Sequence, residues 1–137
     1  MSSSVAECVY EELSTSVALA AAVSTRIAPE SRPTQYNLPC VVYEVGTATA
    51  ANQLNGGASI VSGTVDVTVY AESVLGLDAA ANAIRAAMDG VTGTLDGTNY
   101  AFQLQDETTE YEPAVDGEDF GVVSKRMTLF YTKDIED

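Results

Sequence analysis

The sequence predicts an α+β domain in which helices pack on one face of a small, mostly antiparallel sheet. Apolar residues recur at helical spacing near the N-terminus and again after residue 76. Between Ile60 and Tyr70, valines alternate with polar residues, which is typical of a strand in a sheet covered on one side. Two helical segments among several strands fit one covered face better than two.

The N-terminal segment is predicted to be a helix with an interruption. Its apolar residues lie four positions apart and form one stripe: Val5, Val9, Leu13 and Val17. Ser14–Ser16 is expected to break this helix, and Val17–Val23 to form a second short helical piece. Arg26–Pro29 follows as a short extended segment, before a loop that contains Pro33 and ends near Pro39.

Two strands joined by a long connection are predicted next. Leu38–Val45 is rich in β-branched and aromatic residues, and Ile60–Tyr70 alternates most clearly of all. Gly46–Ser59 consists of small and polar residues without periodicity. We therefore expect a long flexible loop over residues 46–59, with a hairpin tip at Asn55–Gly57.

The C-terminal half predicts one more helix and further strands. Leu77–Asp89 has an apolar stripe and should end at Gly90, where a helix C-terminus favours glycine. Turns are expected at 94–97, with Asp96–Gly97 as the corner, and at the acidic segment 114–119. The predicted strands are Tyr100–Gln105, with pairing resuming near Thr108–Glu112, and Val122–Thr132.

Length and hydropathy predict one domain over residues 1–137, with its core at about 5–133. The chain has 137 residues, which is typical of one domain. Its longest apolar run, Val17–Val23, is far shorter than a membrane span, so no membrane partner is expected. The N-terminus lacks the basic and apolar regions of a signal peptide, and the protein is expected to remain in the compartment where it is made.

The charge balance is strongly acidic. Twenty acidic residues oppose six basic ones, for a net charge of −14. Binding to DNA phosphates requires clustered Lys and Arg, and only Lys125 and Arg126 are adjacent, so a DNA-gripping protein is not predicted. The acidity serves either solubility or the repulsion of DNA that must slide past.

No catalytic, cofactor-binding or metal-binding residues are predicted. The chain has no histidine, Cys8 and Cys40 stand far apart as expected buried thiols, and no nucleotide-binding or nucleophile motif is present. Asp116, Glu118 and Asp119 lack the ligand spacing of a calcium loop and are interpreted as a solvated turn. Asp66 should lie on the polar face of its strand, as a surface or interface residue. These absences favour a building block or a binding module.

The order of the motifs resembles the tail-terminator or tail-completion proteins of long-tailed bacteriophages. The similarity rests on an ordered set: Val17–Val23 leading to Arg26-Ile27 and Pro29, then Leu38–Tyr43, Val65–Ala71, the alanine-rich helix 79–88, and Arg126–Tyr131. Together these segments span roughly residues 5–133.

This resemblance implies a structural virion protein without catalytic residues. It implies a homo-oligomeric ring, typically a hexamer, that caps the finished tail tube, ends tail polymerisation and provides the head–tail joining surface. The implied partners are further copies of the chain, the tail tube protein and a head-completion or neck protein, with DNA passing through the lumen without specific binding. The implied location is the tail or neck of the virion, and the host cytoplasm during assembly. The 46–59 loop would then become ordered only in the assembled particle.

Three alternatives remain open at the level of sequence. A neck or head-completion ring, of the connector or stopper kind, would also be small and acidic. A protein-binding module unrelated to phage would account for the lack of a catalytic motif. An enzyme would have to rely on carboxylates alone, with Asp66 and the 116–119 cluster as its candidates.

Overall fold

The protein is described here from a computed structural model that covers residues 5–23, 27–29, 39–53, 57–95, 98–112 and 122–134. Its helices are α1 (Val5–Ser14), α2 (Val17–Val23) and α3 (Val74–Met88). Its strands are β1 (Ile27–Pro29), β2 (Cys40–Gln53), β3 (Gly57–Ala71), β4 (Val91–Leu95), β5 (Thr98–Glu112) and β6 (Val122–Asp134).

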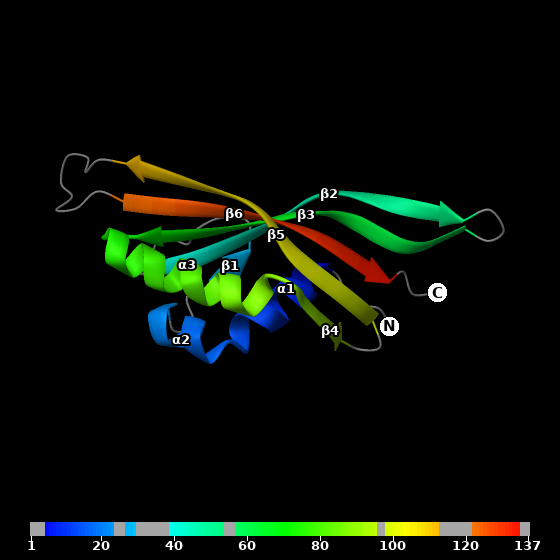
Figure 1. Cartoon of the computed structure of the whole chain (residues 1–137), viewed down its shortest axis with the longest axis horizontal. Helices are drawn as coiled ribbons and strands as arrows, with labels where there is room; N and C mark the ends of the chain where they lie inside the picture. Colours follow the sequence, from blue (N-terminus) through cyan, green and yellow to red (C-terminus); the bar gives the residue numbers. More distant parts are fainter. Residues whose placement is uncertain are drawn as a thin grey trace.

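The described strands form a single six-stranded sheet in the order β1-β2-β3-β6-β5-β4. β1 runs parallel to β2, and every other pairing is antiparallel. All three helices lie on one face of the sheet, and the β2–β3 hairpin projects beyond them as an arm (Figure 1). The predicted α+β class, with a mostly antiparallel sheet and one covered face, is confirmed.

The core lies between the apolar face of the two central strands and α3. Val65, Val67 and Val69 of β3 are completely buried, as is Met127 of the neighbouring β6. The buried side of α3 is formed by small and medium-sized residues: Leu77, Ala80, Ala81, Ala83, Ile84 and Met88. Its alanines let the helix approach the sheet closely. Burying each of the larger side chains contributes about 1.5–3 kcal/mol, so this contact dominates the stability of the fold.

Hydroxyl side chains determine where the helices begin and end. The Thr15 hydroxyl donates a 2.7 Å hydrogen bond to the Glu11 carbonyl, and Ser16 Oγ accepts one of 3.1 Å from the Leu19 amide. These contacts end α1 and cap α2, which confirms the predicted interruption. Ser73 accepts from the Gly76 amide at 3.2 Å, so α3 begins at Val74, three residues before the predicted start. Gly90 follows α3 with a φ of 74°, the conformation expected of a glycine after a helix.

The prediction of a loop over residues 46–59 is wrong for the residues that the structure describes. β2 continues to Gln53 and β3 begins at Gly57, and the connecting residues 54–56 lie outside the described ranges. Small and polar residues gave no periodic signal, yet their backbone groups still form a hairpin ladder. Two register shifts, between Val45 and Ala48 and between Ala51 and Asn52, interrupt this ladder and are of the kind that increases strand twist.

The region after α3 also differs from the prediction. Thr94 and Leu95, expected in a turn, belong to β4, an edge strand paired only with β5 among the described residues. The predicted corner at 96–97 and the acidic turn at 114–119 lie outside the described ranges. The two predicted strand segments between 100 and 112 form one strand, with a bulge between Leu104 and Asp106. On the β4 side of β5, beyond the end of the β4 pairing, the Leu104 amide donates to the Asp89 carboxylate at 3.0 Å.

Tyr100 connects α1 to the β4–β5 edge. Its hydroxyl donates a 2.5 Å hydrogen bond to Glu12 of α1, and its register partner on β4 is Gly93. A Cβ placed on Gly93 would lie 2.6 Å from the Tyr100 hydroxyl oxygen, so only glycine leaves room for the ring in this position. Burial and the neighbouring Glu12 both raise the pKa of Tyr100.

Two buried tyrosines should respond differently to the loss of their hydroxyls. The Tyr131 hydroxyl is buried and has no hydrogen-bond partner among the described residues, whereas the Tyr100 hydroxyl has Glu12. Removing an unpaired hydroxyl relieves a desolvation cost, while removing a paired one leaves its acceptor unsatisfied. We expect Tyr131→Phe to leave stability unchanged or to raise it, and Tyr100→Phe to lower it by about 1 kcal/mol. Urea unfolding of both variants measures this, and a larger loss for Tyr131→Phe would contradict it.

Candidate interaction surfaces

The residues considered for chemistry in the sequence do not converge. Cys8 and Cys40 are buried thiols that form no disulfide, as predicted, and burial raises the pKa of Cys8 to about 11. Asp66 lies on the sheet face opposite the helices, where it accepts a 2.8 Å hydrogen bond from Thr128. The acidic residues 116, 118 and 119 lie outside the described ranges. Within those ranges, no group of three or more His, Cys, Asp or Glu residues is placed to hold a metal ion.

The sheet face opposite the helices is acidic in its central part. Glu44 of β2 pairs with Asp66 of β3, and Asp66 pairs with Thr128, whose other neighbour is Asp106 of β5. Three carboxylates therefore occupy one row across four strands, with only a threonine between two of them. Such a row repels anions and favours water or a cationic partner.

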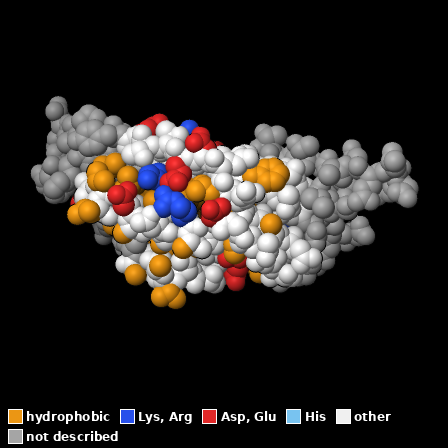
Figure 2. Space-filling view, viewed as in Figure 1, with side chains coloured by type: hydrophobic (Ala, Val, Ile, Leu, Met, Phe, Trp, Pro, Cys, Tyr) orange, Lys and Arg blue, Asp and Glu red, His pale blue; other side chains and the backbone are white. Residues whose placement is uncertain are grey.

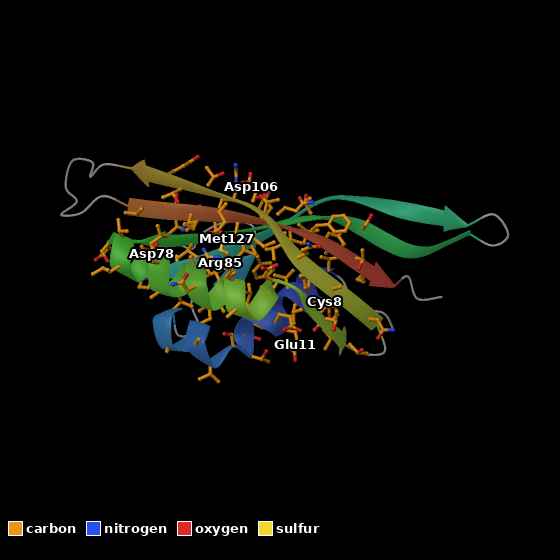
Figure 3. All side chains as sticks on the ribbon, viewed as in Figure 1. Cys8, Glu11, Asp78, Arg85, Asp106 and Met127 are labelled. Carbon is orange, nitrogen blue, oxygen red and sulfur yellow. The ribbon has the colours of Figure 1, made fainter. Side chains whose placement is uncertain are left out.

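A second charged group joins α3 to the sheet on the covered side. Arg85 donates to both oxygens of Glu107, through Nη2 at 2.6 Å and Nε at 3.3 Å, and to Asn82 of its own helix. The Lys125 ammonium lies 3.7 Å from the same Glu107 and 3.9 Å from Asp78. The basic side chains form a compact cluster bordered by acidic ones (Figure 2), and Arg85 and Asp78 both extend from α3 in Figure 3. Sequence spacing gave no signal of this cluster, because its members come from three separate elements.

Apolar side chains are exposed on the helix layer. Val17 at the start of α2 is 84% exposed, and Val74 and Leu75 at the start of α3 are 59% and 84% exposed. α2 contains no charged residue, although the chain as a whole is strongly acidic. Exposed valine and leucine at helix ends provide contact area for another protein.

The β2–β3 arm is uncharged. Glu44 and Asp66 are register partners, and no Asp, Glu, Lys or Arg occurs in the sequence between them. β4, at the opposite edge of the sheet, is also free of charge. The charged residues of the sheet are therefore concentrated on one half of it, and the half that carries the arm and β4 is nearly neutral, with Lys133 and Asp134 at the end of β6 as its charged residues.

The described surface has several hollows that are open to solvent. One lies over β4, β5 and β6 and is lined by Thr92, Ala101 and Thr132, among others, and another lies between Tyr10, Tyr43 and Leu95. Among the described residues that line these hollows, no acid and base are placed beside a nucleophile. None of the helices in the described ranges has the length and apolar character needed to cross a membrane.

Comparisons with known proteins agree with this arrangement. Residues 7–116 match the family described as tail completion protein gp17. A chain of the solved structure "Virion of native gene transfer agent (GTA) particle" is 19% identical, with a TM-score of 0.63 over 94% of this chain and 92% of that one. A second solved structure is 12% identical, with a TM-score of 0.59 over 98% of each chain. At these identities the two structures show a shared fold alone. No curated protein matches the sequence.

The contact between Arg85 and Glu107 should make stability depend on pH in a specific window. The hydrogen bond from Arg85 lowers the pKa of Glu107. A lowered carboxylate pKa stabilises the fold above the unfolded value of about 4.3, and that contribution is lost as the pH falls through the folded value. Because both side chains are about one-third exposed, we expect Glu107→Gln to cost only about 0.5–1 kcal/mol at pH 7.

Urea unfolding of wild type and Glu107→Gln at pH 7 and at about pH 3 measures this difference. The difference between the two proteins should shrink at the lower pH, because Glu107 of the wild type becomes protonated as the pH falls through its lowered pKa. Glu110→Gln is the matched control, because Glu110 lies on the same strand but on the opposite face of the sheet. A cost for Glu107→Gln that persists unchanged at about pH 3 would contradict the prediction.

Proposed function

The chain belongs to the family of tail completion protein gp17, and from this premise we propose that it forms a ring on the end of the completed tail tube. In this role it ends tail polymerisation and presents the surface to which the head is joined. The observation that carries the proposal is the family match over residues 7–116, which includes most of α1, all of α2 and α3, and strands β1 to β5.

Membership of this family makes the chain a structural protein of the virion, located in the tail region, and not an enzyme. We further infer that residues 1–137 act as one structural unit. The buried residues of the helices and of β1–β3, β5 and β6 support this, because they belong to one apolar cluster.

A ring requires an interface that repeats from copy to copy by rotation, which is a head-to-tail contact between two different surfaces of the same chain. The described part of the molecule offers such surfaces in its two uncharged sheet edges and in its exposed apolar helix ends. Hexamers are the state we propose. The tail tube protein on one side and a head-completion or neck protein on the other are the proposed partners.

The acidic sheet face supports a second part of this proposal. A net charge of −14 per subunit is multiplied by the number of copies in a ring. We place the row of Glu44, Asp66 and Asp106 toward the channel, where it would keep DNA from adhering to the wall. The apolar ends of α2 and α3 are then available to the tube or the neck.

The ring is tested by adding the purified protein to preassembled tail tubes of the same phage. We expect negative-stain images to show a ring at one end of each tube, and tubes capped in this way to stop growing when more tube protein is added. Native mass measurement of the released ring gives its subunit number.

The tube protein alone, which should continue to grow, is the control for that experiment. A protein that leaves tubes uncapped but binds isolated heads would favour the neck or head-completion alternative. A strict monomer that binds neither tubes nor heads would contradict both roles.

A further inference from the structure

We propose that the ring is held together by the sheet itself: the outer edge of β2, over residues 45–53, pairs with β4 of the neighbouring copy. This inference rests on the proposed ring and identifies the surface that builds it. The partner at this edge is a second copy of the same chain.

Among the strands that the structure describes, the outer edge of β2 has no partner along most of its length. β1 pairs with Val41, Val42 and Tyr43 only, and beyond Tyr43 none of the described strands lies on that side of β2. A strand edge presents unpaired N–H and C=O groups, and these can add a strand from another chain. β4 is the opposite edge of the sheet, with β5 as its one described neighbour.

Charge distinguishes these two edges, on β2 and β4, from a third open edge on β5. Natural proteins protect open edges with charged residues and bulges. β5 extends past β4 as an open edge, and there it carries Asp106, Glu107, Glu110 and Glu112 together with a bulge. The open part of β2 beyond Glu44 and the whole of β4 carry no charged residue. Charged residues therefore protect the β5 edge against pairing with another strand. The uncharged edges of β2 and β4 can still accept a partner strand.

The two uncharged edges lie at the same level of the sheet. The pairings connect Ala50 of β2 through Val61, Lys133 and Tyr100 to Gly93 of β4, so these five residues form one row. Four successive antiparallel pairings separate the edges, which makes β2 and β4 parallel to each other. When copies are placed side by side with the same orientation, β4 of one copy meets β2 of the next as a parallel pair.

The electrostatics favour a second copy as the occupant. Two chains of charge −14 repel each other, and they can approach most easily where neither carries charge. Pairing β2 with β2 would join two copies around a two-fold axis and close a dimer. Only the pairing of two different edges leaves one of each free and can therefore continue into a ring.

Two double variants test the pairing. Thr47→Glu with Thr49→Glu alters the β2 edge, and Thr92→Glu with Thr94→Glu alters the β4 edge, where both threonines are exposed. We expect each variant alone to form no rings on tail tubes. Each retains one unaltered edge, so an equal mixture should form a two-subunit complex and nothing larger, as measured by native mass spectrometry.

Thr108→Glu with Thr109→Glu is the matched control. It adds the same two charges to β5, opposite Arg126 and Lys125, and rings should still form. Rings in both edge variants, or a mixture that stays monomeric, would overturn the inference. Wild type is assayed in parallel: if it also forms no ring, the proposed function fails, whereas wild-type rings together with variant rings overturn the edge pairing alone.

Hydrogen exchange provides a second measurement that does not depend on variants. Amides of residues 45–53 and 91–95 whose N–H groups point to the open edges should exchange more slowly in the wild-type ring than in the free chain. The amides of β3 and β6 are paired in both states and serve as the internal reference. Unchanged exchange at both edges after ring formation would overturn the inference even if the variants failed to fold.

Discussion

The whole arrangement depends on burial of one apolar face of the sheet. The two central strands, β3 and β6, place Val65, Val67, Val69 and Met127 on that face, and α3 covers them. Because side chains alternate along a strand, this choice also determines what the opposite face carries. The helices are all on one side, and the second face and the ends of the sheet are left for other contacts (Figure 1).

The acidic residues are not spread evenly over the sheet. Where α3 crosses β5 and β6, Arg85 and Lys125 neutralise Glu107 and Asp78, so two of the six basic residues connect the helix to the sheet. On the opposite face, Glu44, Asp66 and Asp106 lie in one row, and Arg126 of β6 lies on the same face. The half of the sheet that carries the arm and β4 is nearly neutral. Two acidic chains can therefore approach each other there with the least repulsion.

Sequence reasoning predicted the fold where the pattern was strong. The valine alternation of β3, the stripe of α3, Gly90 after it and the Ser14–Ser16 interruption were all visible in the residues and are confirmed. It failed where strands are made of Thr, Ala, Ser and Gly, as in the arm and β4, because such residues carry no periodic hydrophobic signal and are paired only through their backbones. The Arg85–Glu107 contact was invisible for another reason: its members are distant in sequence and meet only through tertiary packing. The family was predicted from an ordered set of weak motifs, and the match over residues 7–116 confirms it.

The bulges of β2 and β3 affect whether free chains aggregate through the open β2 edge before assembly. A long, flat, uncharged edge pairs with any strand it meets, which leads to aggregation. The register shifts near Val45 and Ala51 interrupt the ladder and add twist, so a partner strand must follow that twist to pair over its whole length. Gly46 permits the register shift near Val45, because a Cβ at position 46 would lie only 2.8 Å from Thr64 Oγ1. Under the proposed pairing, the same irregularity discourages random association of free chains and gives a curved continuation of the sheet, which is what a closed ring requires and a straight fibre does not.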